Sequence, residues 1–264
     1  MTYVIGLDYG TDSVRALLVK AENGEIVATS VFTYPRWEKG LFCDPAKNQF
    51  RQHPLDHLEG LENTIAEVVR ESGIAKSQIK GICVDTTGSS PMAVDQNGES
   101  LAFSEGFQEN PNAMMVLWKD HTAIKEAAEI TELSRTWGGE DFTKYSGGIY
   151  SSEWFWSKIL SIHRKDKGVA NATFSWMEHC DYITGVLTGI DPVNLKRSRC
   201  AAGHKALWHQ DWDGLPPESF LSQLDSSLAG LRKNLFAKSY TSNEVAGKIS
   251  KHWALKLGLS EDTL

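Results

Sequence analysis

The first part of the chain alternates apolar runs with short polar turns. The apolar runs are Tyr3–Leu7, Ala16–Val19 and Ile26–Phe32, and the turn Glu22–Glu25 contains Asn-Gly, a dipeptide favoured in tight hairpins. Runs of this length joined by such short connections are typical of strands that fold back on their neighbours. The pattern predicts three successive antiparallel strands.

The pattern then changes from strand to helix and back. Residues Tyr34–His53 are rich in Pro, Gly, Asn and aromatic residues without periodicity, which predicts a long ordered loop. Pro54 begins a predicted helix whose apolar residues recur at spacings of three and four: Leu58, Leu61, Ile65 and Val68. The run Ile79–Asp85 predicts a buried parallel strand that carries its final carboxylate to the carboxyl edge of the sheet, and Met92–Val94 predicts another strand.

Beyond His121 the pattern is mainly helical. We expect helices over Ala123–Leu133, Ser152–His163 and Trp176–Leu187, separated by loops that contain glycine. No internal repeat and no linker divides the sequence. The prediction is therefore one compact α/β domain over residues 1–264, with a mixed sheet, flanking helices and a helical insertion.

Composition narrows the classes of function. The apolar fraction of 41% and the charged fraction of 23% are those of a globular protein, and the net charge of −7, with no run of Lys or Arg, argues against a nucleic-acid partner. No segment approaches the ~20 apolar residues of a membrane span, so we expect a cytoplasmic protein with no membrane partner. The nine tryptophans, several beside polar residues, suit a sugar site, although most are expected in the core. The separated cysteines are expected to be reduced packing residues: Cys43, Cys83, Cys180 and Cys200.

The polar turn after the first strand has the residues of a phosphate-binding hairpin. Gly10 allows the backbone to approach an anion closely, while Thr11 and Ser13 supply hydroxyl and amide donors. Asp8, at the carboxyl end of the first strand, is placed where a carboxylate can hold Mg²⁺ beside phosphate oxygens. An ordinary hairpin with a polar turn fits these residues equally well, because short motifs occur often by chance.

Longer segments carry a resemblance to a known family. They are Gly6–Arg15, Tyr34–Trp37, Asn48–Pro54, Glu109–Met114, Leu117–Thr122, Gly148–Trp156 and Arg199–Trp208. Together they resemble the FGGY family of carbohydrate kinases, and within it the L-ribulokinases. The resemblance runs along the whole chain and implies the ribonuclease-H-like fold of the actin-like ATPase and sugar kinase superfamily.

The resemblance also implies roles for individual residues. It places Gly10, Thr11, Ser13 and Arg15 at the phosphates of ATP, and Asp8 at Mg²⁺. These are the donors, cation and carboxylate that phosphoryl transfer needs, because its catalysis is mostly positioning and electrostatic stabilisation. Arg15 also fits a solvent-exposed residue at the end of a strand.

A second group of residues is implied at the sugar. Gly88 matches a small residue that contacts the ketose, and glycerol kinases carry Arg-Glu at Gly88-Ser89, so the pair leaves room for a larger substrate. Lys205 matches a lysine that binds the sugar. The remaining implied substrate-binding residues are expected as site neighbours more than as direct ligands: Trp118, Asp120, Tyr150 and Glu153.

The implied activity is ATP-dependent phosphorylation of L-ribulose to L-ribulose 5-phosphate, in L-arabinose breakdown. In this family the catalytic base is the aspartate of a Gly-x-x-Asp segment, and a second domain supplies most of the nucleotide site. The resemblance places both beyond Leu264, so we expect no catalytic base in this chain and an amino-terminal half that is inactive alone. Asp262 does not fit the base, because it follows a helix end. An apolar face shaped for the second domain predicts a homodimer or poor solubility.

Two alternatives stay open. Another pentulose or polyol kinase of the family, such as a D-ribulose kinase, shares these motifs, and phosphorylation rates for several sugars would separate the two. The other alternative is a non-catalytic sugar- or nucleotide-binding protein that ends at Leu264. A reading frame that continues into an apolar strand and Gly-x-x-Asp would argue against it.

Overall fold

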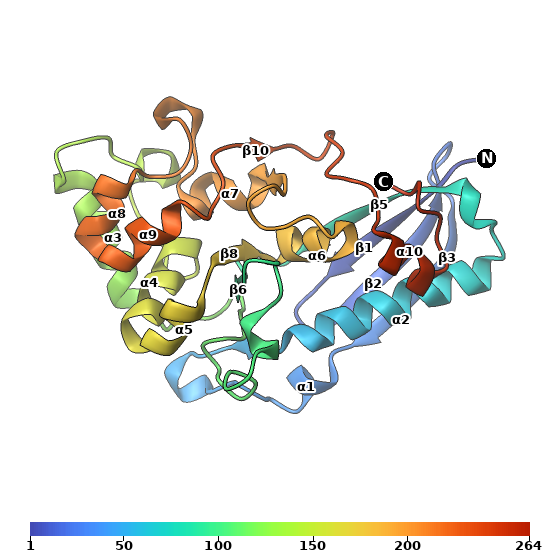
Figure 1. Ribbon diagram of the computed structural model, residues 1–264, viewed down its shortest axis with the longest axis horizontal. Helices are drawn as coiled ribbons and strands as arrows, with labels where there is room; N and C mark the ends of the chain where they lie inside the picture. Colours follow the sequence, from blue (N-terminus) through green and yellow to red (C-terminus); the bar gives the residue numbers. More distant parts are fainter.

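A four-stranded mixed sheet forms one end of the molecule in the computed structural model, which describes residues 1–264 (Figure 1). The strand order is β3-β2-β1-β5, with β1 antiparallel to β2, β2 antiparallel to β3, and β1 parallel to β5. The bounds are β1 (Tyr3–Tyr9), β2 (Ser13–Lys20), β3 (Ile26–Thr33) and β5 (Ile79–Thr86). The three predicted antiparallel strands and the mixed sheet are therefore confirmed.

Helix α2 (Pro54–Ser72) packs along β2 and β3 and buries the inner face of the sheet. It begins as predicted at a proline, whose missing N–H is harmless in the first turn. Close approach to the sheet depends on Gly60, because a Cβ at this position would stand 2.5 Å from Cγ1 of Val14. The core at this end includes apolar residues of both layers: Ile5, Leu7, Val14, Ala16, Leu18, Leu61, Ile65 and Val68.

The other helices are shorter, and several lie away from the sheet. Figure 1 shows α3, α4, α5, α8 and α9 gathered at the opposite end from the sheet, where a second hydrophobic cluster is centred on residues such as Trp156 and Phe220. The bounds are α1 (Pro35–Glu38), α3 (Ile124–Thr136), α4 (Phe155–Lys165), α5 (Lys167–Ala172), α6 (His179–Thr188), α7 (Arg199–Ala206), α8 (Glu218–Leu224), α9 (Ser226–Arg232) and α10 (Lys251–Leu257). None of these helices has the length and apolar character needed to cross a membrane.

Three short strand pairs connect the sheet to the helical end. They are β4 (Arg51–Gln52) with β7 (Met115–Val116), β6 (Pro91–Val94) with β8 (Ser175–Glu178), and β9 (Arg197–Ser198) with β10 (Ser239–Tyr240). The predicted loop Tyr34–His53 contains both α1 and β4. The predicted helix Trp176–Leu187 begins later than expected, because its first residues form β8 and pair with β6. A short apolar run fits a strand as well as a helix, and pairing with a distant segment decided this one.

The parallel orientation predicted for β5 is confirmed, but the prediction that the strand is buried is wrong. The strand is parallel to β1, but it is the outermost strand of the sheet, and Lys80, Cys83 and Asp85 are exposed. The last residues of the chain cover part of β5: the Ile82 N–H donates to the Leu264 carbonyl at 2.8 Å, and the hydroxyl of Thr263 donates to the Ile79 carbonyl at 3.1 Å. An apolar sequence therefore marked a strand correctly, while its position in the sheet decided how much of it meets water.

Candidate active site

The polar hairpin joins β1 to β2 at the carboxyl edge of β1. The N–H of Gly10 donates to the carbonyl of Ser13 at 2.9 Å, which closes the turn. Asp8 is exposed and lies opposite Arg15 on one neighbouring strand and Asp85 on the other. The hairpin thus presents a carboxylate, a guanidinium and the turn's hydroxyl donors at one edge of the sheet.

The carboxylates of Asp8 and Asp85 fit a magnesium ion shared with a nucleotide. Directly paired residues of adjacent strands project from the same face, and both of these side chains are exposed. Mg²⁺ is usually held by one or two carboxylates together with substrate phosphates. No group of three or more His, Cys, Asp or Glu side chains in the chain could hold a metal by itself.

Trp118 and Gln52 hold the hairpin from the side. The indole Nε1 of Trp118 donates to the hydroxyl of Thr11 at 3.0 Å, and the amide of Gln52 donates to the carbonyl of Thr11 at 2.7 Å. Trp118 keeps 38% of its surface exposed, so a ligand could still reach its ring. The predicted sugar-side residue Trp118 is thus brought to the predicted phosphate-side residue Thr11, although the two are far apart in the sequence.

Gly88 and Lys205 meet beside this hairpin. The N–H of Thr87 donates to the carbonyl of Tyr9 at 3.0 Å, which ties the loop after β5 to the end of β1. A Cβ on Gly88 would stand only 2.8 Å from Nζ of Lys205, which lies in the last turn of α7. Gly88 therefore leaves the space in which the ammonium group lies.

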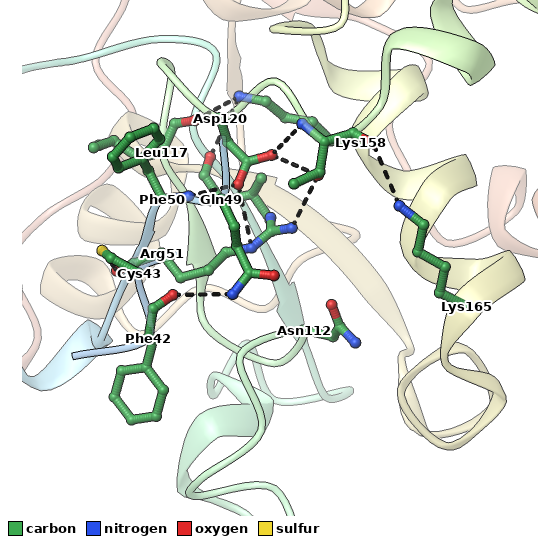
Figure 2. A network of polar contacts seen from close by, with 12 residues as sticks. Phe42, Cys43, Gln49, Phe50, Arg51, Asn112, Leu117, Asp120, Lys158 and Lys165 are labelled. Atoms are coloured by element: carbon green, nitrogen blue, oxygen red, sulfur yellow. Dashed lines mark hydrogen bonds and ion pairs between the residues drawn. The ribbon is translucent and has the colours of Figure 1, made fainter. Parts of the chain in front are cut away.

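A buried network supports the Gly88 loop from below. The carboxylate of Glu178, at the end of β8, accepts from the hydroxyl of Ser89 and from the N–H of Ser90, the latter at 2.7 Å. Lys158, in α4, donates to the carbonyl of Ser89 at 2.7 Å and to that of Leu117 at 2.8 Å. One lysine thus joins the loops that carry Gly88 and Trp118, and Figure 2 shows its bond to Leu117.

Burial perturbs both charged groups of this network. It lowers the pKa of the Lys158 ammonium to about 7 and raises the pKa of the Glu178 carboxyl, because a low-dielectric interior disfavours the charged form of each. The opposite charge of the partner and the hydrogen bonds from Ser89 and Ser90 act against the rise at Glu178. Lys205 also favours the charged carboxylate, which places it within electrostatic reach of this network.

Two of the predicted substrate-binding residues lie beneath the site. Asp120 is fully buried, and its oxygens accept from the N–H of Phe50 at 2.8 Å and from the hydroxyl of Thr122 at 2.6 Å (Figure 2). Tyr150 is 2% exposed, and its hydroxyl bonds to the carbonyl of Lys205. Both side chains therefore position other residues, and a direct contact with sugar does not fit their burial.

Glu153 is half-buried in the loop just before α4, where its Oε1 lies 3.3 Å from Nε2 of His121. It remains a candidate at the edge of the site. The analysis of the sequence missed Lys158 and Glu178. A usable signal was present: Lys158 is the one charged residue of the run Phe155–Ile162, and Glu178 directly follows the apolar pair Trp176–Met177.

The fold of this chain is similar to that of solved carbohydrate and glycerol kinases. A xylulose kinase from Rhodospirillum rubrum superposes with a TM-score of 0.75 at 20% identity, covering 98% of this chain and 46% of that one. A glycerol kinase from Plasmodium falciparum, solved with ADP, superposes with a TM-score of 0.68 at 14% identity. At such low identity these structures define the fold class, which is that of the sugar kinases.

The sequence comparison is more specific. The pattern of the FGGY family of carbohydrate kinases, N-terminal domain, matches residues 3–264, and the chain belongs to this family. It is 50% identical over 262 residues to a ribulokinase of Vibrio parahaemolyticus, covering 98% of this chain and 46% of that protein. A ribulokinase of Shouchella clausii is 35% identical over 269 residues. The chain thus spans about half the length of the curated relatives that it matches.

Proposed function

We propose that this chain is the amino-terminal half of an ATP-dependent ribulokinase that converts L-ribulose to L-ribulose 5-phosphate in L-arabinose breakdown. The observation that carries the proposal is the meeting of the phosphate-type hairpin with Gly88 and Lys205 at one edge of the sheet. The 50% identity to a ribulokinase supports the choice of sugar. The enzyme would act in the cytoplasm on small molecules, without nucleic-acid or membrane partners.

The hairpin would bind the transferring phosphoryl group. The donors of Thr11 and Ser13 are suited to phosphate oxygens, Gly10 lets the backbone approach them closely, and the guanidinium of Arg15 offsets their negative charge. Asp8, with Asp85 beside it, would hold Mg²⁺, which when bound supplies charge neutralisation at the phosphates.

Lys205 would bind the sugar across the space left by Gly88. Its ammonium can donate a hydrogen bond to a sugar hydroxyl and favour the negative charge that develops on the attacking oxygen. That oxygen forms a bond to the γ-phosphorus, the bond from this phosphorus to the β-bridging oxygen breaks, and ADP leaves. The hydroxyl proton passes to a base that the proposal assigns outside these 264 residues, in a carboxyl-terminal domain.

A kinase assay on the full-length protein tests the proposal. Phosphorylation of L-ribulose should exceed that of D-ribulose, ribitol and xylulose in kcat/KM, and preference for another of these would overturn the choice of sugar. Lys205→Met should lower kcat/KM by a factor of about 100 or more, since one stabilising donor at a developing oxyanion contributes on that order. Lys238→Met, an exposed lysine of the same chain, is the matched control. Assayed alone, residues 1–264 should show no turnover.

The proposal includes a homodimer. Its support is an apolar groove of about 450 Å³ along β5 and α6, with Ile82, Val84, Leu187 and Ile249 among the lining residues. Exposed apolar surface of this kind favours association. Light scattering that shows a monomer at high concentration would contradict this part and leave the assignment of activity intact.

A further inference from the structure

A polar cavity of about 280 Å³ lies beside Arg51. The pair Arg51–Asp120 separates it from Lys158, the α4 lysine that bonds to the Gly88 loop (Figure 2). Helix α4 contributes Ser161 and Lys165 to its wall. The remaining polar wall comes from the segment around β4 and from the loops before and after β7, through Lys47, Gln49, Arg51, Asn112 and Thr122. Seven of its eight lining residues are polar or charged, which sets it apart from the apolar groove beside β5.

The wall of this cavity carries only positive charge. Lys47, Arg51 and Lys165 line it, and no Asp or Glu does. Arg51 is close to one buried carboxylate, with its Nε 3.5 Å from Oδ2 of Asp120, and Lys47 pairs with a carboxylate outside the wall. Lys165 donates to a backbone carbonyl at 3.3 Å and is in no ion pair. Lys165 is therefore the cation of this wall that no carboxylate balances, and its charge favours an anion there.

Two polar groups of the wall lack partners. Arg51 is 3% exposed, and its Nη1 has no hydrogen-bond acceptor, while its Nη2 donates to the hydroxyl of Thr122 at 3.3 Å. The hydroxyl of Ser161 is also buried without a partner. Buried donors in folded proteins are nearly always satisfied, and leaving one unpaired costs about 1–3 kcal/mol. Burial correspondingly lowers the pKa of Arg51.

We propose that this cavity binds a small oxyanion, such as phosphate, between Arg51, Ser161 and Lys165. Its oxygens would accept from the unpaired Nη1 and hydroxyl and would lie beside the free ammonium of Lys165. The amides of Gln49 and Asn112 stand at the same wall but already donate elsewhere, to the carbonyl of Phe42 at 3.3 Å and to the carboxylate of Asp166 at 3.1 Å, so the proposed site does not depend on them. The site is separate from the hairpin that would bind ATP, and it rests on none of the residues assigned to the kinase reaction.

Nuclear magnetic resonance of the ¹⁵N-labelled chain tests this site directly. Inorganic phosphate is titrated at constant ionic strength, because screening by salt would otherwise mimic or mask binding. We expect saturable shifts of the backbone amides of Gln49, Asn112 and Lys165. A parallel titration with acetate shows whether a planar carboxylate is accepted as well as a tetrahedral anion.

Two variants and a control separate this site from other phosphate binding. Lys165→Gln should weaken phosphate binding about ten-fold or more, as expected for loss of one charged donor. Ser161→Ala should weaken binding without lowering the midpoint of urea unfolding, because this hydroxyl has no partner to lose. Lys167→Gln makes the same charge change at an exposed position outside the wall and should leave the affinity unchanged.

Three results would overturn the proposal. One is a set of shifts that do not saturate with phosphate or acetate. Another is a set of shifts confined to the hairpin residues 10–13. The third is equal weakening by Lys165→Gln and Lys167→Gln, which would indicate a general charge effect.

Discussion

Replacement of Lys158 by Met should destabilise the chain strongly, because its ammonium joins two loops of the candidate site. Nζ donates to the carbonyls of Ser89 at 2.7 Å and Leu117 at 2.8 Å, and opposes the buried charge of Glu178. Met has similar length but no donor. Loss of two buried hydrogen bonds, together with an uncompensated carboxylate, should lower the free energy of unfolding by about 2–4 kcal/mol at pH 7.

The same variant makes a prediction about pH. The pKa of Lys158 is lowered from 10.5 to about 7 in the folded chain, so between these two values the unfolded chain binds more protons than the folded one. The contribution of Lys158 to the free energy of unfolding therefore increases as pH rises from 7 toward 10.5. The Met variant lacks it, and the gap between the two proteins should widen from pH 7 to pH 9, with a limiting slope of about 1.4 kcal/mol per pH unit.

Urea unfolding followed by tryptophan fluorescence at pH 7, 8 and 9 measures both effects. Lys125→Met is the control, because this lysine is 83% exposed on α3 and should change stability by no more than ~0.5 kcal/mol. A Lys158→Met protein within ~0.5 kcal/mol of the parent at pH 7, with no widening by pH 9, would refute the role given to the network.

Three further predictions concern packing, protonation and a buried tyrosine hydroxyl. Gly60→Ala should lower the free energy of unfolding by about 1–3 kcal/mol despite the higher helix propensity of alanine, because the new Cβ would lie 2.5 Å from Cγ1 of Val14. Adding Val14→Ala to the same chain should recover part of that loss, and additive losses in the double variant would contradict the contact. Burial lowers the pKa of His163 from 6.5 to about 4, so the contribution of the neutral imidazole to the free energy of unfolding is complete above pH 6.5 and is lost as pH falls toward 4. Urea unfolding should therefore show the difference in stability between the parent and His163→Gln narrowing over that pH range. Tyr150→Phe removes the acceptor of the Trp156 N–H at 2.9 Å and should cost about 1–3 kcal/mol by the same measurement, with an unchanged midpoint as the contrary result.

The parts of the fold that could be predicted from the sequence depend on local pattern. The strands β1–β3, the tight turn with Gly24 at a φ of +75°, and the start of α2 at Pro54 each follow from residues within one short segment. The wrong predictions concern long-range pairing. Trp176 begins a strand because β6 lies beside it, and β5 is exposed because no further strand covers most of its edge.

The candidate site divides in the same way. The hairpin residues Asp8 and Thr11 could be proposed from their own segment, and the family resemblance pointed to Gly88 and Lys205; their roles stay predictions. Burial of Asp120 could not be foreseen, because the groups that occupy its oxygens include the distant Phe50 N–H.

The sequence by itself thus determined local residue chemistry and periodicity: a glycine-containing polar turn between two strands, an amphipathic helix that begins at a proline, and a family pattern over residues 3–264. Tertiary structure alone decided which polar groups face solvent and which support others. The physical reason is that burial and hydrogen bonding depend on segments that are far apart in the sequence, as when the carboxylate of Glu178 accepts a hydrogen bond from the hydroxyl of Ser89. The lysine beneath the site and the cationic cavity behind it are both products of that assembly.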